Sequence, residues 1–416
     1  MTNNRFPHIV IAATARTPIG IKCGTLSRCS AEDLSVLAAE EVLRRSGIAP
    51  EKIDAVVGAN VYQFTAPGTQ DIYFARNVAL RCGLDTGTPA LLVQRICGSG
   101  LQTVVNAFQQ IALPECVDDA RIVLCVAGET MSRTPRILRA PRTRANFWEF
   151  VEGADVEDTM LASLNHDLAH TSMMLTADEY GTRMEVTRAE CDAFAELSHT
   201  RARAANRASH LNGGDALRGM FVVDTTDPTG QTVHLARDEC VRQTSLETLA
   251  KLSVLTPHGL VTAGNASEIS DGAGAVLLAD RAEADRQGLP HRFEIAAYGV
   301  GAVDPRVMGR GPVPAIGQAL ERAGISQKDV GLWEINEAFA AQSLGVEKEL
   351  KLDRETVNVN GGAIAIGHPL AATGARLITD LMYEMERRGV RWGCASACIG
   401  GGQGVAVLLQ DTETAR

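Results

Sequence analysis

The sequence predicts an α/β protein built from two related halves, with a segment of different character inserted into the first half. Its 416 residues exceed what one hydrophobic core usually organises. Hydrophobic residues make up 45% of the chain but aromatic residues only 4%. The core must therefore consist of small aliphatic side chains, as is typical where helices pack closely on sheets. One order of helix, glycine, polar turn and buried strand also occurs twice along the chain.

The repeat joins two stretches that lie 277 residues apart. RSGIAPEKIDAVVGA at 45–59 follows an amphipathic helix predicted for 33–44, and RAGISQKDVGLWEIN at 322–336 follows one predicted for 315–321. A second pair of similar stretches, AVLLAD at 275–280 and AVLLQD at 406–411, comes in each case after a glycine-rich turn. Two independent similarities favour two related halves, packed against each other, over coincidence.

Residues 132–221 interrupt the regular alternation of strands and helices. They contain basic and polar stretches, a methionine-rich run and the helical sequence EVTRAECDAFAELSHTRARAANRA. Because hydrophobic periodicity persists, we expect a packed insertion rather than a flexible linker. The predicted boundaries are 1–131 and 222–284 for the first half, 132–221 for the inserted loop domain and 285–416 for the second half.

Charge and composition exclude several classes of protein. The formal net charge of −10 gives no general attraction for nucleic acid or an anionic membrane. No stretch of about 18 apolar residues predicts a membrane span, and the first residues do not resemble a secretory signal. The ten cysteines are scattered, as in a cytoplasmic protein with reduced thiols. Cys394 and Cys398 form a single CxxxC pair, which does not predict a metal site.

The stretch LLVQRICGSGLQTVV, at 91–105, places Cys97 between an apolar strand and a helix that begins near Gly98. The amides and dipole at a helix N-terminus stabilise a thiolate, so we expect a pKa below the usual value of roughly 8.5. The glycines at 98 and 100 allow a ligand or backbone to approach closely. On this stretch alone, an inert buried cysteine is an equally good interpretation.

Three further stretches carry candidate site residues. His368 lies in a loop of small residues in VNVNGGAIAIGHPLAATGARL, at 357–377. Cys398 precedes three glycines, whose bare N–H groups could form an oxyanion hole. Asn336 closes a buried strand in EINEAFAAQ. Taken singly, they are also explained by a structural hydrogen bond, a tight turn and helix capping.

Taken together, these stretches resemble the thiolase family nearly from end to end. Each motif is short, but eight of them occur in the order and spacing of that family. They are ARTPIG at 15–20, CGSG at 97–100, GETMS at 128–132, TAGNAS at 262–267, DGAGA at 271–275, NEAFAAQ at 336–342, GGAIAIGHPLAATGAR at 361–376 and CIGGGQG at 398–404.

The resemblance implies a fold and a reaction. Thiolases have two similar βαβαβαββ halves that form a five-layered αβαβα core, with a loop domain inserted in the first half. They catalyse reversible thiolytic cleavage of a 3-ketoacyl-CoA by CoA, giving acetyl-CoA and a shortened acyl-CoA; the reverse reaction is a Claisen condensation. Coenzyme A is a substrate, and no metal or redox cofactor is expected. Family members are dimers or tetramers, so a homodimer or homotetramer is expected.

The resemblance also implies roles for residues in the motifs. Cys97 resembles the nucleophile that becomes acylated, and His368 resembles the base that activates it. Cys398 resembles the second acid and base of the reaction. Asn336 resembles the residue that orders a water beside His368 in one oxyanion hole. The backbone N–H groups of Cys97 and Gly400 resemble the other oxyanion hole.

Coenzyme A is expected to lie across the loop domain. By the same resemblance, Ser267 in TAGNAS matches a pantetheine contact, and Arg242 matches a residue beside the adenine. The basic stretch RILRAPRTR, at 136–144, is a further candidate for contact with the 3′-phosphate.

The sequence departs from the family pattern in and around the expected acyl pocket. Ser172 stands where members specific for acetoacetyl-CoA usually have His, and Met174 replaces a Gly, with Met173 between them. Gln94 replaces an Asn, and Ala371 replaces the Gly of HPxG. These departures leave the identity of the acyl group open.

Two other functions remain to be distinguished. A decarboxylating ketoacyl synthase of the same superfamily usually lacks the second reactive cysteine, and Cys398 argues against it. A non-catalytic protein that binds acyl-CoA on a thiolase fold would not need Cys97, His368 and Cys398 together.

Overall fold

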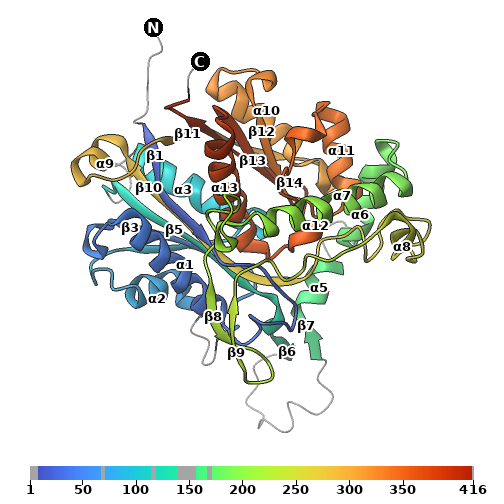
Figure 1. Cartoon of the computed structure of the whole chain (residues 1–416), viewed down its shortest axis with the longest axis horizontal. Helices are drawn as coiled ribbons and strands as arrows, with labels where there is room; N and C mark the ends of the chain where they lie inside the picture. The colour runs from blue at the N-terminus through green and yellow to red at the C-terminus, as the bar shows by residue number, and fades with distance from the viewer. Residues whose placement is uncertain (1–7, 67–70, 114–118, 139–155, 166–170, 415–416) are drawn as a thin grey trace, which may run out of the picture.

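The structure is a computed structural model that describes residues 8–66, 71–113, 119–138, 156–165 and 171–414 (Figure 1). The first half follows the predicted βαβαβαββ order, and the second half has the same order except that no strand forms among the described residues 350–370. The first half comprises β1 (Ile9–Arg16), α1 (Ala31–Ser46), β3 (Ala55–Ala59), α2 (Phe74–Arg81), β4 (Ala90–Val93), α3 (Ser99–Ala112), β5 (Ile122–Thr130) and β10 (Ser270–Asp280). The second half comprises β11 (Phe293–Ala302), α10 (Pro312–Ala323), β12 (Leu332–Ile335), α11 (Ala340–Leu350), α13 (Leu370–Arg388), β13 (Trp392–Ile399) and β14 (Gln403–Asp411).

The two repeated stretches of sequence adopt the same structure in both halves. Helices α1 and α10 end at Gly47 and Gly324, whose φ angles of 70° and 67° are readily adopted only by glycine. A strand follows in each case, β3 in the first half and β12 in the second. The similar stretches AVLLAD and AVLLQD lie in β10 and β14, which pair antiparallel with β1 and β11. The prediction of two related halves is confirmed.

All the strands of the two halves join in one sheet, in the order β12-β13-β14-β11-β1-β10-β5-β3-β4. The short strand β2 (Gly20–Ile21) pairs with β10 beside this path. The halves meet at β1 and β11 through only two residue pairs, Val10 with Glu294 and Ile11 with Phe293. In the first half the sheet is mixed. Strand β3 runs parallel to β4 and β5, whereas β10 runs antiparallel to β1 and β5.

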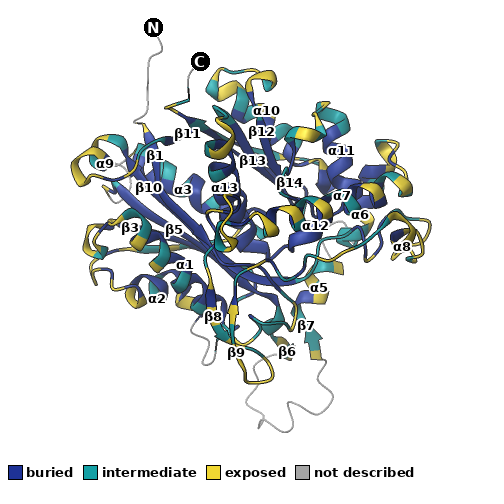
Figure 2. Cartoon of the chain, in the orientation of Figure 1, coloured by how far each residue is buried: buried dark blue, intermediate teal, exposed yellow. Residues whose placement is uncertain are grey.

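Helices cover both outer faces of the sheet and fill the space between its two halves. One core cluster joins α1 and α2 to the first half of the sheet, and another joins α10 and α11 to the second half. A third cluster contains α3 and α13 between the halves. Figure 1 shows α13 between the α1–α2 side and the α10–α11 side. In Figure 2 the central strands β1, β5 and β10 are buried along their whole length. The predicted five-layered core is confirmed.

Helices α3 and α13 cross in the middle layer without side chains between them. A Cβ atom at Gly100 would lie 2.3 Å from the carbonyl oxygen of Ala371. A Cβ atom at Gly374 would lie 2.1 Å from the amide nitrogen of Leu101. Only glycine permits this approach. Because both glycines lie in the first turns of their helices, the residues that precede the two helices are brought together.

The elements between β5 and β10 pack against both halves rather than forming a linker. They are β6 (Arg136–Leu138), β7 (Val156–Asp158), α5 (Thr159–Asn165), α6 (Met173–Arg183), α7 (Arg188–Arg207), β8 (Val223–Thr226), β9 (Thr232–Leu235) and α8 (Leu246–Ala250). Strands β8 and β9 join the core of the first half, whereas α7 packs against the second half. Phe194 and Cys191 of α7 share a core cluster with Leu344 of α11 and Ile364 of α12 (Ala363–Ile366). The domain boundaries stay a prediction. Among the described residues, no helix is long and apolar enough to cross a membrane.

Replacing Gly100 by Ala is expected to lower the free energy of unfolding by about 1–3 kcal/mol, because the new methyl group would overlap backbone atoms of α13. Urea unfolding midpoints at a fixed protein concentration measure this change. The matched control is Gly317→Ala in the exposed face of α10, where a Cβ meets no atom within 4 Å. That change should stabilise the protein by about 0.5–1 kcal/mol. Equal midpoints for Gly100→Ala and the unmodified protein would contradict the proposed helix contact.

Candidate active site

Cys97 lies in a strained turn between β4 and α3. The preceding residue, Ile96, has a φ of 42°, in the left-handed region that β-branched residues rarely adopt. The Ser99 hydroxyl donates a hydrogen bond to the Ile96 carbonyl at 2.7 Å and accepts one from the Arg95 amide at 2.8 Å. These bonds hold the turn closed. Strain of this kind collects at functional sites, where it fixes the direction of a reactive side chain.

Cys97 is partly buried, and it lines a cavity. Burial raises the pKa of the thiol to about 11, and the nearby Glu129 carboxylate adds to the rise. The backbone N–H groups of Gly400 and of Cys97 itself act in the opposite direction. The prediction of a lowered pKa is therefore wrong. A helix N-terminus stabilises a thiolate, but here the loss of water outweighs that effect.

His368 lies between α12 and α13 and is 6% exposed. Its Nδ1 atom lies 2.6 Å from the Thr373 hydroxyl, and its Nε2 atom lies 3.3 Å from the Asn336 amide nitrogen. A tautomer with the proton on Nδ1 satisfies both contacts and leaves Nε2 as an acceptor. Burial, and secondarily the positive charge of Arg376, lowers the pKa of His368 to about 3. The imidazole is therefore neutral near pH 7 and can accept a proton.

Asn336 and Cys398 complete the group of predicted site residues. Asn336 follows β12 directly and is fully buried, and its Oδ1 atom has no hydrogen-bond partner within the described part of the chain. Cys398 is fully buried at the end of β13, in a cluster with Met308 and Phe339. Burial raises the pKa of its thiol, with a further contribution from Cys97. The Cys398 cluster also includes Met173 and Met174.

A cavity of about 410 Å³ reaches Cys97 and His368. Four methionines line it, which gives its wall flexible, polarizable side chains. These are Met131, Met173, Met174 and Met308. Its remaining lining includes Ser267, so three residues predicted for substrate binding, Ser267, Met173 and Met174, face one space.

Two parts of the chain match models of known domains. Residues 9–282 match the thiolase N-terminal domain, and residues 289–411 match the thiolase C-terminal domain. The chain belongs to the thiolase family.

Relatives of this thiolase include enzymes with both of the common family names. It is 41% identical over 407 residues to the mitochondrial 3-ketoacyl-CoA thiolase of Homo sapiens, covering 97% of this chain and 98% of the human one. It is 39% identical over 409 residues to the acetyl-CoA acetyltransferase of Rhizobium meliloti (strain 1021), covering 97% and 99%. The crystal structure of the human mitochondrial enzyme in complex with CoA matches with a TM-score of 0.89 at 41% identity, covering 98% of each chain.

Ser172 does not lie in the lining of the cavity of this thiolase. Its hydroxyl accepts a hydrogen bond from the Leu175 amide at 3.2 Å and so caps the N-terminus of α6. The cap fixes the start of the helix that carries Met173 and Met174. Met173 also closes over Gly400, since its Sδ atom lies 3.3 Å from where a Cβ of Gly400 would be. The role of Ser172 is therefore to position the helix.

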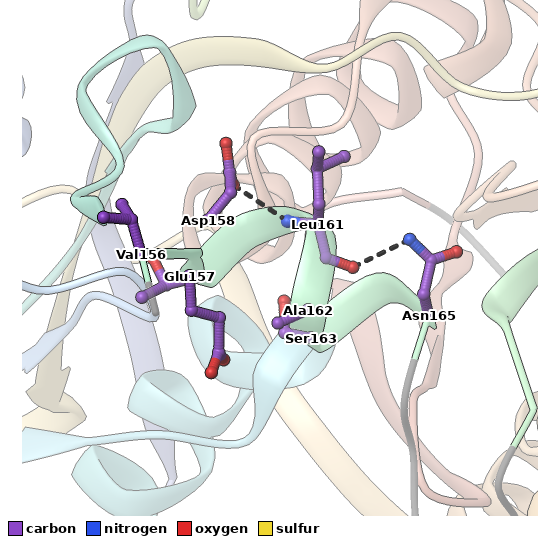
Figure 3. Close-up of a pocket in the computed structure, with 8 residues that line it drawn as sticks. Val156, Glu157, Asp158, Leu161, Ala162, Ser163 and Asn165 are labelled. Atoms are coloured by element: carbon purple, nitrogen blue, oxygen red, sulfur yellow. Dashed lines mark hydrogen bonds between the residues drawn. The ribbon is translucent and has the colours of Figure 1, made fainter. Parts of the chain in front are cut away.

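Helix α5 of the inserted segment forms another wall of the cavity through Leu161, Leu164 and Asn165. Figure 3 shows how this helix is held at both ends. The Asp158 carboxylate accepts a hydrogen bond from the Leu161 amide at 3.0 Å, and the Asn165 side chain donates to the Leu161 carbonyl at 2.8 Å. The helix also contacts the first half, because the hydroxyl groups of Ser163 and Tyr62 lie 2.6 Å apart.

Arg242 lies beside the cavity rather than in its lining. Its Nη1 atom donates a hydrogen bond to the Glu268 carboxylate at 2.5 Å, and Glu268 does line the cavity, next to Ser267. Most of the basic stretch at 136–144 lies outside the described residues. Of the two other departures from the family pattern, Gln94 is exposed, and Ala371 is fully buried with a negative φ that does not require glycine.

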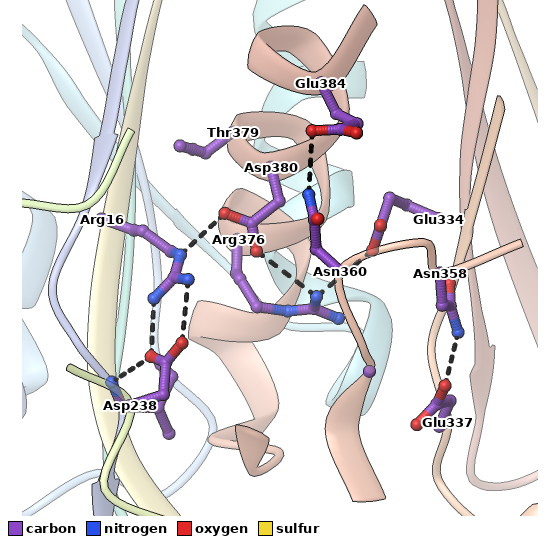
Figure 4. Close-up of polar contacts among 12 residues, drawn as sticks. Arg16, Asp238, Glu334, Glu337, Asn358, Asn360, Arg376, Thr379, Asp380 and Glu384 are labelled. Atoms are coloured by element: carbon purple, nitrogen blue, oxygen red, sulfur yellow. Dashed lines mark hydrogen bonds and ion pairs between the residues drawn. The ribbon is translucent and has the colours of Figure 1, made fainter. Parts of the chain in front are cut away.

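Buried ion pairs fix the helix that follows His368 (Figure 4). Arg16 of β1 binds Asp380 of α13 at 2.8 Å and Asp238 at 2.7 Å, and all three side chains are almost fully buried. Arg376 of α13 binds Glu334 of β12 at 3.2 Å. Removing one partner of a buried pair commonly costs about 3–5 kcal/mol. The ion pairs thus hold α13, and with it His368, between the two halves of the sheet.

The sequence prediction missed Thr373 and Glu129. Thr373 lies in the first turns of α13, five residues after His368, and this spacing was the available signal for its contact with the imidazole. Glu129 is part of the GETMS motif, to which no role was assigned. Both residues act through contacts that only the folded chain brings together.

Replacing Thr373 by Val should lower kcat by up to about 10²-fold, because His368 would lose the hydrogen bond that fixes its ring and tautomer. Steady-state thiolysis assays measure kcat and KM separately. Thr373→Ser keeps the hydroxyl and is the matched control, expected to stay within a few-fold of the unmodified enzyme. A fully active Thr373→Val enzyme would show that the hydrogen bond does not orient the base.

Proposed function

We propose that this thiolase cleaves 3-ketoacyl-CoA with CoA through an acyl intermediate on Cys97. The observation that carries the proposal is the cavity shared by Cys97 of the first half and His368 of the second. Cys398 lies in the cluster that includes Met173 and Met174 of the cavity wall. A strained turn directs the thiol, and a neutral imidazole can accept its proton. These groups support acyl transfer by a ping-pong route.

In the first half-reaction, His368 Nε2 takes the proton of Cys97 as the sulfur attacks the C3 carbonyl of the substrate. The bond between C2 and C3 then breaks, and its electron pair stays on C2 of the departing acetyl-CoA. Cys398 gives its proton to that carbon. The products of this step are acetyl-CoA, a thioester on Cys97 and a thiolate on Cys398.

In the second half-reaction, the Cys398 thiolate takes the proton of the incoming CoA thiol. The CoA sulfur attacks the thioester carbonyl and forms the shortened acyl-CoA, and Cys97 leaves as a thiolate. His368 returns its proton to Cys97, which restores the starting state. Reversal of both half-reactions is the Claisen condensation.

Two sets of donors support the oxygens that gain charge. Asn336, with its unsatisfied Oδ1 atom, is suited to hold a water beside His368 for one oxygen. The backbone N–H groups of Cys97 and Gly400, which already point at the Cys97 sulfur, are suited to the other. Donors fixed before the reaction stabilise such charge at little reorganisation cost.

The lining of the cavity indicates how the substrate lies. We place pantetheine against Ser267 and the adenine end of CoA near Arg242, which the Glu268 carboxylate holds at the side of the cavity. The four methionines and Phe339 favour an uncharged hydrocarbon acyl group. A series of straight and branched 3-ketoacyl-CoA substrates, followed by loss of the enolate absorbance, would identify its length.

We also propose a homodimer that forms at the edge of the sheet. Strand β4 ends the sheet, and its Leu91 is 44% exposed, with Leu80 of α2 and Leu113 after α3 exposed to a similar degree. An exposed apolar edge strand invites pairing with a second copy. A cytoplasmic location is supported by the nine cysteines within the described residues, all of which are free thiols.

Incubation with acetyl-CoA should add one acetyl group to Cys97, detected by mass spectrometry of the digested protein. The Cys97→Ala variant should gain no acetyl group. A protein that binds CoA tightly but is never acetylated would be the non-catalytic acyl-CoA-binding protein instead. Release of CO₂ from a malonyl thioester would indicate a decarboxylating ketoacyl synthase.

Replacing His368 by Ala should lower kcat for thiolysis by about 10²–10⁴-fold, the usual effect of losing a general base. Cys97→Ala, which removes the nucleophile, sets the background rate. If His368→Ala retains near-normal turnover, another group must deprotonate Cys97.

Replacing Leu91 by Lys should convert the dimer into monomers, because a charge would be buried at the paired edge. Light scattering after size-exclusion chromatography gives the mass directly. Lys251 is an exposed residue directly after α8, far along the chain from β4, and Lys251→Leu is the control that should keep the dimer. A dimeric Leu91→Lys variant would place the interface elsewhere.

A further inference from the structure

We infer that Glu129 is a positioning residue of this thiolase, whose buried carboxylate joins the start of α13 to the segment after β3 and so sets His368 against Cys97. The inference rests on the roles proposed above for Cys97 and His368. Glu129 itself lies near the end of β5, in the first half, and is fully buried.

Four N–H groups converge on the Glu129 carboxylate. Its Oε1 atom accepts hydrogen bonds from the Asn60 side chain and the Tyr62 amide, both at 2.9 Å. Its Oε2 atom accepts from the Val61 amide at 3.1 Å and from the Ala371 amide at 3.2 Å. Three of these donors belong to the segment after β3. The fourth belongs to the second half of the molecule.

The bond to Ala371 reaches the catalytic base. Ala371 lies in the first turn of α13, where amides have no partner within the helix, and a carboxylate there also meets the positive end of the helix dipole. The His368 ring is only three residues away along the chain. Glu129 therefore fixes the end of α13 from which His368 projects.

The bonds to Val61 and Tyr62 reach the nucleophile and the cavity wall. The Tyr62 ring packs with Leu370 and the Cys97 side chain. The Tyr62 hydroxyl lies 2.6 Å from the Ser163 hydroxyl of α5. One carboxylate thus holds the elements on three sides of the cavity: the turn beside Cys97, the start of α13 and, through Tyr62, helix α5.

The charge of Glu129 also acts on Cys97. Burial raises the pKa of Glu129 to about 7, opposed by its backbone donors, and Asp271 on β10 raises it further. The other titratable groups around Cys97 include His368, Cys398 and Tyr62, and Lys22 and Glu268 line the same cavity. An ionised Glu129 opposes a thiolate on Cys97 in the resting enzyme, so loss of its charge should make the thiol easier to ionise.

Two variants of Glu129 separate the effect of its charge from the effect of its side-chain length. Glu129→Gln removes the charge and turns an NH₂ group toward two N–H donors. We expect a fall in kcat of about 10–10²-fold with KM for the CoA thioester changed by less than about 3-fold, as for a misplaced base. Glu129→Asp keeps the charge but is one methylene shorter, so kcat should fall without the change in thiol ionisation.

Alkylation of Cys97 by iodoacetamide as a function of pH measures thiol ionisation without any acyl transfer. The midpoint for Cys97, located by mass spectrometry, should move to lower pH in Glu129→Gln and stay in place in Glu129→Asp. The matched control is Asp411→Asn at the end of β14. Asp411 is also a buried carboxylate that accepts a backbone hydrogen bond, from Glu413 at 3.0 Å. That variant should lose stability but keep both kcat and the midpoint.

An unchanged kcat and an unchanged midpoint in Glu129→Gln would overturn the inference. So would an Asp411→Asn variant that loses activity and shifts the midpoint to the same extent, since the effect would then be structural. If Glu129→Gln does not fold, the Glu129→Asp variant is sufficient as a test, because an unchanged kcat in that variant would overturn the inference. The acetyl adduct on Cys97 of the unmodified enzyme separates the two proposals, because its absence removes the proposed function whatever the Glu129 variants do.

Discussion

The contact between α3 and α13 at Gly100 and Gly374 is the constraint on which the active site depends. Helices that carry side chains at a crossing lie about 8–10 Å apart. Here the backbones themselves are in contact, and the two helix starts lie at the same place in the molecule. Residues almost 300 positions apart in the chain become neighbours for this reason. The ion pairs of Arg16 and Arg376 then hold α13 in that position from its other sides.

The close packing that creates the site also sets its electrostatics. A dry interior of small side chains disfavours charge, so the pKa of Cys97 is raised and the pKa of His368 is lowered by the same cause. In the resting enzyme, the Cys97 thiol and the His368 imidazole are both neutral. A thiolate then exists only while its proton is on the imidazole, next to the carbonyl that it attacks. The enzyme thereby avoids keeping an exposed anion that oxidants could reach.

The sequence was sufficient for the fold and the family, but not for the environment of the candidate site residues. The repeat of helix, glycine and strand predicted both halves correctly because those signals are local. Cys97 and His368 were predicted from residue types at the starts of helices. Their individual roles stay predictions. The pKa of Cys97 was predicted wrongly, since burial depends on what distant segments cover. Ser172 was assigned to the pocket because capping by its own helix was not considered. Thr373 and Glu129 act through folded contacts that no local pattern contains.

The equivalence of α3 and α13 in the two halves has a consequence for how such a site can arise. Two identical halves related by a twofold axis would bring two identical helix starts face to face. An ancestral homodimer of this kind would hold matching residues there, with no division of labour. In a fused polypeptide each copy would be free to change alone, one toward a sulfur nucleophile and the other toward an imidazole. Asymmetric chemistry thus needs only a few substitutions on a symmetric scaffold.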